Sequence, residues 1–255
     1  MIRRPPRSTL DRSSAASDVY KRQQFRAAVT GKLKPAKYPS FELDDSHEGE
    51  IIDLVHETGR DVPLSKVRFK DGSISFIPAT LGTKVGSKIN FGLASEIKDG
   101  NVISIQNIPD GSTVCNVEKQ FGDGGALIKS AGGNATVFSH TDNGVVLKLA
   151  SGKFTTLNPK NRAMIGTLAG GGVKDRPLMR AGVAWRRFRS KGHKYPIVRG
   201  VAQAAYVHPH GGGRHQHVGQ SSTVSRNAPP GAKVGSIAAR KTGRARIKER
   251  KQSIK

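Results

Sequence analysis

Apolar and polar positions alternate in short runs from about residue 48 to residue 168, a period of two that is typical of β-strands with one buried face. The first five runs, within residues 49–106, read GEIIDLVH, SKVRFK, SISFIP, KINFG and NVISIQ. Turn signals separate them, and Asp71-Gly72 between the second and third runs predicts a hairpin. Runs spaced by about ten residues suit a small closed barrel, because closure removes exposed strand edges.

A second set of runs lies within residues 112–169 and reads STVCNVE, GALIKS, NATVFSH, GVVLKLA, KFTTLN and AMIGTLA. Between the two sets, Pro109 and Asp110-Gly111 interrupt strand pairing, so we expect a break near residues 107–112. The pattern therefore predicts a mainly β fold with two small barrels in tandem. One larger barrel is the alternative.

The sequence changes character after Gly170-Gly171-Gly172, where Lys, Arg, Gly and His replace the alternating apolar residues. A short helix is expected within residues 178–190. Beyond Pro196 no stretch is able to bury a core. We therefore predict that this segment is extended and that it becomes ordered only against a partner.

Charge is distributed in blocks along the 255-residue chain, whose formal net charge is +24. Residues 1–40 carry ten Lys or Arg and two acids, a net charge of +8. Residues 41–173 carry thirteen and fifteen, a net charge of −2, and residues 174–255 carry twenty and two, a net charge of +18. A near-neutral body with two basic extensions is typical of proteins that bind nucleic acid through their arms.

A single cysteine, Cys115, excludes a disulfide within the chain and favours a reducing compartment. Its place in the strand-like run STVCNVE predicts a buried structural thiol rather than a nucleophile. No apolar run approaches the ~18 residues of a membrane span, so no membrane partner is expected. Residues 1–23 lack the apolar stretch of a secretory signal, and we interpret them as a non-native or disordered basic segment.

Residues 207–219, VHPHGGGRHQHVG, place four histidines, one arginine and three consecutive glycines together. The spacing H-x-H-x4-H-x-H permits a Zn²⁺ site, but an all-histidine site in one short loop is unusual and no cysteine or acid is nearby. General acid–base catalysis needs a histidine oriented by a second group, typically a carboxylate, yet residues 176–248 contain no Asp or Glu. Neither zinc binding nor a self-contained active site is therefore the favoured interpretation.

Contact with a polyanion explains this loop better. Glycine has no Cβ, so bare N–H groups can approach phosphates, and the planar fork of Arg214 can bridge two phosphate oxygens or stack on a base. A flexible linker is the plainer alternative for the glycines. Upstream, residues 185–189 (WRRFR) interleave aromatic rings with arginines, a mix that stacks on bases and neutralises phosphates. The alternative for Trp185 and Phe188 is packing in a core.

The sequence of residues 199–244 closely resembles the C-terminal part of the large-subunit ribosomal protein two family in its archaeal and eukaryotic form. The HPHGGG core followed by STVSRNAPPGAKVG carries most of this resemblance. Further segments resemble the same family in the expected order, namely HETGRDVPLSKVRF, IPDGSTVCNVE, GDGGALIKSAGGNATV and SGKFTTLNPKNRAMIGTLAGGG. The likeness extends from about residue 25 to residue 250.

The resemblance implies an OB-type barrel over residues 24–107, an SH3-like barrel over residues 108–173 and a basic rRNA-binding extension over residues 174–255. It implies a non-enzymatic constituent of the large ribosomal subunit, cytoplasmic and ribosome-bound, that supports assembly of the peptidyl-transferase centre and subunit association. The implied partners are large-subunit rRNA, other ribosomal proteins and the small subunit across the intersubunit interface. A metal-binding histidine-cluster protein and a translation-factor-like RNA-binding protein are the alternatives.

In this family the first histidine of HPHGGG has been linked to peptidyl-transferase competence, and that position is His208 here. Because RNA performs the chemistry, we interpret His208 as an organising contact rather than an acid or base. The sequence has Gln203-Ala204 where the family usually has Met-Asn, and Val207 where it usually has an acidic residue. This departure argues against a carboxylate–histidine partnership.

The predicted RNA-binding residues are cationic, imidazole-bearing, aromatic or glycine. They are Trp185, Arg186, Arg187, Arg189, Lys191, Arg199, His208, His210, Gly211, Gly212, Gly213, Arg214, His215, His217, Arg226, Lys233, Arg240, Lys241 and Arg244. No catalytic or metal-binding residue is predicted. Zinc is not expected, and the ions expected with the protein are Mg²⁺ or K⁺ associated with rRNA.

Overall fold

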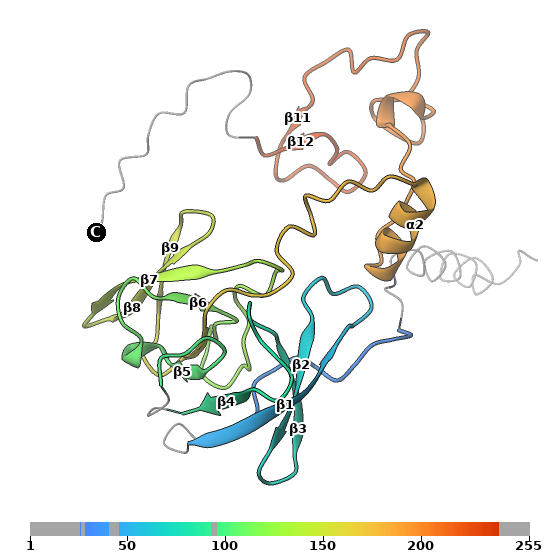
Figure 1. The fold of residues 1–255 in the computed structure, drawn as a ribbon. Helices are drawn as coiled ribbons and strands as arrows, with labels where there is room; N and C mark the ends of the chain where they lie inside the picture. Colours follow the sequence, from blue (N-terminus) through green and yellow to red (C-terminus); the bar gives the residue numbers. More distant parts are fainter. Residues whose placement is uncertain (1–25, 27–28, 41–45, 93–95, 240–255) are drawn as a thin grey trace, which may run out of the picture. The chain divides into compact units, whose positions relative to one another are not determined.

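The computed structural model describes residue 26 and residues 29–40, 46–92 and 96–239 (Figure 1). The chain divides into two compact units, residues 1–195 and residues 196–255, each of which is described by itself. The first unit is mainly β, which confirms the fold class that the alternating pattern predicts. Residues 1–23, interpreted above as a non-native or disordered segment, lie outside the described residues.

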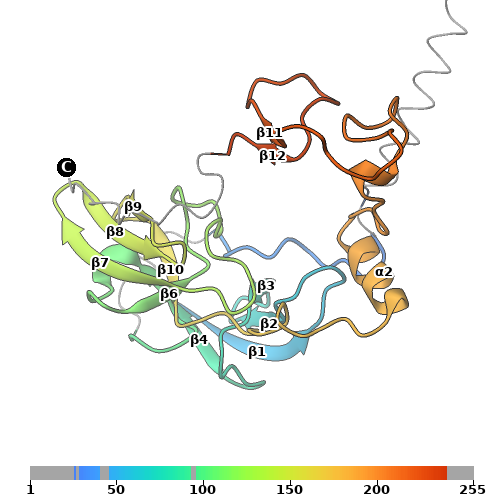
Figure 2. The same cartoon turned by 90° about the horizontal axis from the view of Figure 1, so that it is seen from above.

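The strands of the first unit form one ten-stranded sheet and follow the predicted runs closely. They are β1 (His47–Val55), β2 (Leu64–Phe69), β3 (Ile74–Pro78), β4 (Lys88–Phe91), β5 (Val102–Ser104), β6 (Thr113–Cys115), β7 (Ala135–Thr141), β8 (Gly144–Leu149), β9 (Phe154–Leu157) and β10 (Arg162–Ile165). Their order is β3-β2-β1-β4-β5-β10-β6-β7-β8-β9 (Figures 1 and 2). Neighbours are antiparallel except for the parallel pair of β4 and β5.

The middle of the sheet is buried on both faces. Along β5, Val102 belongs to one hydrophobic cluster and its neighbour Ile103 to a second, and along β10 Met164 and Ala163 divide in the same way. Successive strand residues point to opposite faces, so these strands form a wall between two cores. Residues 107–112 connect β5 to β6 without interrupting the sheet, because both strands pair with β10.

The predicted hairpin at Asp71-Gly72 is confirmed, since β2 and β3 pair antiparallel on either side of it. Gly72 has a φ of +80° and its N–H donates to the Phe69 carbonyl oxygen at 3.0 Å. The Asp71 carboxylate accepts hydrogen bonds from the hydroxyl and the N–H of Ser73. These hydrogen bonds lower the pKa of Asp71 and hold the turn in its conformation.

The predicted strand over GALIKS, residues 125–130, is wrong. Gly125 and Ile128 have φ values of +95° and +54°, outside the extended region that a ladder requires. The N–H groups of Ala126 and Leu127 both donate to the Val117 carbonyl oxygen, and Val117 and Leu127 form an isolated bridge. The segment is therefore a bulged turn that pairs only with Asn116 and Val117, the two residues after β6.

A buried ion pair fastens the segment before β1 to the sheet. Arg162 on β10 is 7% exposed and Glu118 is fully buried, and Nη2 and Nε of Arg162 lie 2.7 Å and 3.1 Å from Oε1 of Glu118. Nη1 of Arg162 donates to the Pro39 carbonyl oxygen at 2.9 Å. The guanidinium carbon lies 5.5 Å from the ring centres of both Tyr38 and Phe121. Burial raises the pKa of the Tyr38 hydroxyl well above its usual value, so Tyr38 is protonated in this site.

Cys115 on β6 is a buried thiol, as its strand-like run predicts. Burial raises the pKa of this thiol to about 12, so it stays protonated and unreactive near neutral pH. In the part of the chain that the structure describes, no helix is long and apolar enough to cross a bilayer.

The helix predicted within residues 178–190 is α2 (Ala181–Ser190), and its only buried residue is Ala184. The second unit contains the short parallel pair β11 (Thr223–Val224) and β12 (Ser236–Ile237), and a single turn of 3₁₀-helix spans Gly200–Ala202. None of residues 196–239 is buried, which agrees with the prediction that this segment has no core.

The prediction that this segment is extended is wrong for residues 200–213, where the chain folds back on itself. The N–H of Gly212 donates to the Gln203 carbonyl oxygen at 3.1 Å, and the N–H of His208 donates to the Ala204 carbonyl oxygen at 3.2 Å. Glycine makes this possible, because Gly212 and Gly213 have φ values of +85° and +81°. The requirement for a partner stays a prediction.

Candidate nucleic-acid interface

Helix α2 presents aromatic rings together with arginines, as residues 185–189 predict. Trp185 is 43% exposed, and the guanidinium of Arg189, one turn further on, lies 4.9 Å from its ring centre. Phe188 is half-buried and stacks on Tyr195 with ring centres 5.1 Å apart and an interplanar angle of 17°. Packing in a core does not describe Trp185, whose ring retains an accessible face of the kind that stacks on bases.

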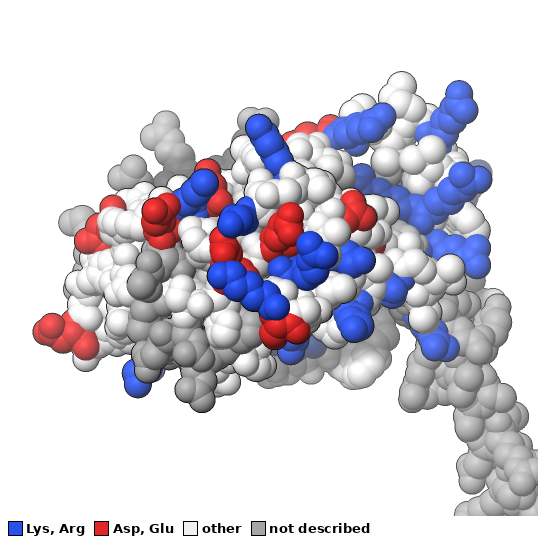
Figure 3. Space-filling model, turned by 60° about the horizontal axis from the view of Figure 1, so that its bottom comes forward, with Lys and Arg blue, Asp and Glu red and all other residues white. Residues whose placement is uncertain are grey.

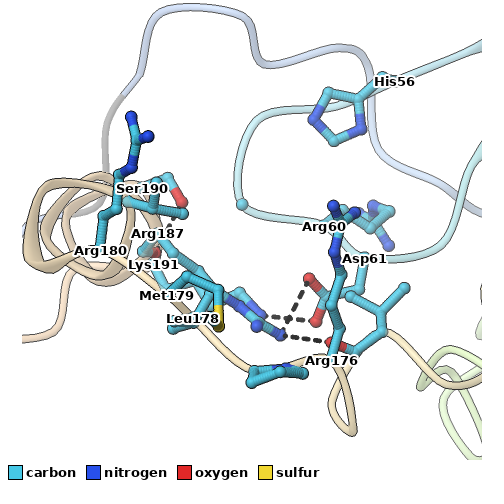
Figure 4. Close-up of a pocket in the computed structure, with 14 residues that line it drawn as sticks. His56, Arg60, Asp61, Arg176, Leu178, Met179, Arg180, Arg187, Ser190 and Lys191 are labelled. Atoms are coloured by element: carbon cyan, nitrogen blue, oxygen red, sulfur yellow. Dashed lines mark hydrogen bonds and ion pairs between the residues drawn. The ribbon is translucent and has the colours of Figure 1, made fainter.

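Two of the predicted RNA-binding cations that the structure describes form ion pairs within the protein. Nζ of Lys191 lies 2.6 Å from Oδ2 of Asp61, and Nη2 of Arg187 lies 4.0 Å from Oδ1 of the same carboxylate (Figure 4). The hydrogen bond from Lys191 lowers the pKa of Asp61, which therefore stays ionised. Sequence analysis did not identify Asp61, because nothing in the local sequence indicates that its partner lies 130 residues away.

In the glycine–histidine loop, close packing within the chain explains two of the three consecutive glycines. A Cβ on Gly211 would overlap the backbone at Gln203 and Ala204, and one on Gly212 would lie 2.9 Å from the Cβ of Ala205. Gly213 has no such neighbour, since its closest contact would be 3.7 Å away. A flexible linker is therefore the wrong description of Gly211 and Gly212.

His208 is held in place by its surroundings. A Cβ on Gly200 would overlap the His208 ring, so the ring packs directly on this glycine. Nδ1 of His208 accepts a hydrogen bond from the N–H of His210 at 3.0 Å, and the two imidazoles meet edge to face at 5.1 Å. With Nδ1 as acceptor, Nε2 of the neutral ring is the nitrogen that carries the proton. Sequence analysis missed Gly200, which no local pattern distinguishes from other glycines.

The remaining histidines do not converge with this pair. Nδ1 of His217 lies 2.8 Å from the carbonyl oxygen of its neighbour His215, and both side chains are exposed. No group of three or more His, Cys, Asp or Glu side chains among the described residues is arranged to hold a metal ion. Geometry thus gives no support to the zinc alternative for H-x-H-x4-H-x-H.

The other predicted residues lie on the surface wherever the structure describes them. Arg199 is exposed and donates to Oε1 of Gln216 at 3.0 Å. Among the described residues, the predicted cations that are exposed and make no hydrogen bond, ion pair or ring contact with their side chains are Arg186, Arg214, Arg226 and Lys233. Arg240, Lys241 and Arg244 lie outside the described residues.

The charges of the strand-rich body are mixed, in contrast to those of the extension. On the face shown in Figure 3, Lys and Arg lie next to Asp and Glu. The Glu48 carboxylate forms ion pairs with Nζ of Lys70 at 3.2 Å and with Nζ of Lys88 at 2.9 Å. The Glu50 carboxylate forms one with Nη2 of Arg68 at 3.0 Å. These pairs neutralise the body locally, so attraction to a polyanion has to come from the basic extensions, mainly from residues 174–255.

A near-neutral β body with a cationic extension, exposed aromatic rings and an ordered glycine–histidine loop defines a basic nucleic-acid-binding protein. Residues 98–250 match the family model described as Ribosomal Proteins L2, C-terminal domain. The large ribosomal subunit protein uL2 of Cenarchaeum symbiosum is 78% identical over 228 residues, which cover 89% of this chain and 94% of that protein. The protein of the same name from Nitrosopumilus maritimus is 76% identical over 229 residues, with the same coverage.

A more distant relative from Sulfolobus acidocaldarius, also a large ribosomal subunit protein uL2, is 44% identical over 220 residues, covering 86% of this chain and 92% of that protein. The chain belongs to the ribosomal protein L2 family. The resemblance that HPHGGG and its flanking motifs carry is therefore confirmed.

Proposed function

We propose that this protein is a structural constituent of the large ribosomal subunit that binds rRNA near the peptidyl-transferase centre and supports its assembly and subunit association. One observation carries the proposal: residues 196–239 contain no acid and none of them is buried. Their cations are therefore available to phosphates, which supply most of the affinity in such complexes. The names of the relatives, which are large-subunit proteins, support the same assignment.

The fold is consistent with the two barrels that the family resemblance implies. Strands β1–β5 surround one hydrophobic cluster, and an OB-fold is a five-stranded, partly open barrel. Strands β6–β9, with β5 and β10, surround the second cluster, which suits an SH3-like barrel. We assign the body the role of a rigid platform, and we assign rRNA, other ribosomal proteins and the small subunit as its partners.

His208 fits the role of an organising contact. Its ring is fixed by Gly200 and by the N–H of His210, so Nε2 is available to donate to a phosphate or a 2′-hydroxyl. Among the described residues, no carboxylate forms a hydrogen bond or ion pair with this ring. A fixed donor orients an RNA strand without itself taking part in proton transfer.

The test compares equal losses of charge in the extension and in the body. One variant of the full chain carries Arg214→Gln, Arg226→Gln and Lys233→Gln, and the matched control carries Arg68→Gln, Lys70→Gln and Lys88→Gln. Binding to in vitro transcribed large-subunit rRNA is measured as a function of salt. Each lost phosphate contact changes the slope of log K against log salt by about 0.7, so the extension variant should lose about two units of slope.

The control removes the same charge from residues that pair with Glu48 and Glu50, so its slope should stay close to that of the unmodified chain. Co-sedimentation of the full chain with large subunits through a moderate-salt wash completes the test. Equal losses of slope in the two variants, or a chain found only in the soluble fraction, would contradict the proposal.

A further inference from the structure

The first unit contains a hollow that sequence analysis did not identify, with a volume of about 640 Å³ (Figure 4). One wall is the connection from β1 to β2, with His56, Arg60 and Asp61. The opposite wall runs from Val173 through α2 to Lys191. Pockets of roughly 300–1,000 Å³ bury ligands of drug-like size, which includes a single nucleotide.

Contacts between its walls preform the hollow. Lys191 and Arg187 both reach the Asp61 carboxylate, as described above, and Nη2 of Arg187 also donates to the Val173 carbonyl oxygen at 3.5 Å. A Cβ on Gly59 would lie 2.6 Å from the Ser190 carbonyl oxygen, so the connection and the end of α2 pack backbone to backbone. Five cationic side chains and one acid line the hollow, and that acid is already engaged by Lys191 and Arg187.

Exposed apolar side chains form another part of the lining. Met179 is 86% exposed, Val183 is 50% exposed and Leu178 is 38% exposed. Arg176 and Arg180 flank Leu178 and Met179 in the sequence and line the same hollow. This combination suits a ligand with a flat, weakly polar ring and an attached anionic group.

We propose that the hollow takes one unpaired nucleotide of the bound rRNA, with the base against Met179 and Val183 and the phosphate on Arg176 and Arg180. This inference rests on the proposed rRNA-binding function. Sequence-specific RNA recognition commonly uses bases that are splayed out of single-stranded loops and bulges, because such bases expose their faces and edges. An acidic segment of another protein would satisfy the arginines but would not need the apolar ring contact.

The experiment places a photoreactive amino acid at Met179 of the full chain incorporated into large subunits. A second probe at Tyr206, which is 92% exposed in the other unit, reports rRNA contact independently of the hollow. Val183→Trp fills the hollow, and Ala181→Trp places the same ring on an exposed position of α2 that does not line it. Arg180→Glu tests the same contact without adding bulk.

The Met179 probe should cross-link to one rRNA nucleotide that is unpaired in the subunit. Val183→Trp removes the space for the base and Arg180→Glu removes the phosphate contact, so each should lower that yield by about five-fold or more. Ala181→Trp should leave the yield unchanged. Cross-linking to a protein, to a base-paired nucleotide, or with a yield that neither variant lowers would overturn the inference. If the Met179 result overturns the inference but the Tyr206 probe still cross-links to rRNA, the proposed function stands. If the Tyr206 probe does not cross-link and the chain no longer co-sediments with large subunits, the proposed function itself has failed.

Discussion

Replacing Arg162 by Met should unfold the body more readily than any loss of a surface charge. The change removes the two side-chain donors to Oε1 of Glu118, a carboxylate with no exposed surface. Two backbone donors remain, the N–H of Gly124 and the N–H of residue 162, each at 3.0 Å. Removing one partner of a buried ion pair costs about 3–5 kcal/mol, and we expect the lower half of this range because those two donors survive.

The substitution also removes the hydrogen bond from Nη1 to the Pro39 carbonyl oxygen, which contributes about 1 kcal/mol. The expected loss in free energy of unfolding is thus about 4–5 kcal/mol. Urea unfolding of the full chain, followed by far-ultraviolet circular dichroism, measures it, because urea does not screen charges. With a slope of about 1–3 kcal/mol per molar, the midpoint should fall by roughly 1.3–5 M.

Two further variants separate the buried charge from the loss of packing. Arg68→Met breaks the exposed pair with Glu50, whose side chains are 55% and 49% exposed, and should cost less than about 1 kcal/mol. Arg162→Met combined with Glu118→Gln removes both charges and should recover much of the lost stability. Equal losses of stability in Arg162→Met and Arg68→Met would refute the buried-charge argument. It would also be refuted if adding Glu118→Gln to Arg162→Met lowered the free energy of unfolding again by as much as Arg162→Met alone did.

Three further outcomes are expected from the same structure. Cys115 should resist alkylation by iodoacetamide at about pH 8.5 in the native chain and react fully in denaturant, as mass spectrometry would show; rapid native alkylation would contradict its burial. Gly211→Ala should speed proteolysis of residues 200–213 and weaken rRNA binding, because the Cβ overlaps backbone, whereas Gly182→Ala has open space and should change neither. Asp61→Asn should increase amide exchange in α2 at neutral pH. The pKa of Asp61 is lowered in the folded protein, so the wild type should keep its slow amide exchange in α2 above about pH 4 and lose it as pH falls through the lowered pKa. Equal exchange in both proteins at neutral pH would argue against the contact with Lys191.

Much of the fold could be predicted, because each strand carries its own signal. The alternation of apolar and polar residues within β1, β2, β7 and β8 indicates that each strand has one buried face. The Asp71-Gly72 turn fixes the register of the hairpin formed by β2 and β3. The pairing of β10 with β5 and β6 could not be predicted, since it joins residues more than 45 apart in strands that are buried at nearly every position and so show no alternation. GALIKS has the residue types of a strand, but Ile128 has a positive φ, which β-branched residues rarely adopt and which the sequence therefore does not predict.

The candidate site likewise has features that the sequence predicts and contacts that it does not. Charge blocks, WRRFR and HPHGGG are local features, so the sequence identifies the basic extension and the family directly. The contacts that shape these features are not local. Asp61 meets Lys191, and the hollow beside them exists only when the β1–β2 connection and α2 come together. Such contacts depend on tertiary packing, about which neither composition nor spacing gives information.

In the glycine–histidine loop, the residues that determine the path of the backbone differ from those that are exposed to a ligand. Gly211 packs on the backbone of Gln203 and Ala204, and Gly212 packs on the side chain of Ala205, so these two glycines determine the path of the loop. Gly213 has no such neighbour, and both Gly213 and Arg214 are exposed, so we expect their N–H groups and the guanidinium to be the part of the loop that contacts phosphates. A loop whose path is set internally loses less conformational entropy on binding, so more of the electrostatic attraction appears as affinity. The fixed orientation of His208 follows from the same packing, because the turn that holds Gly211 also brings Gly200 beneath the imidazole.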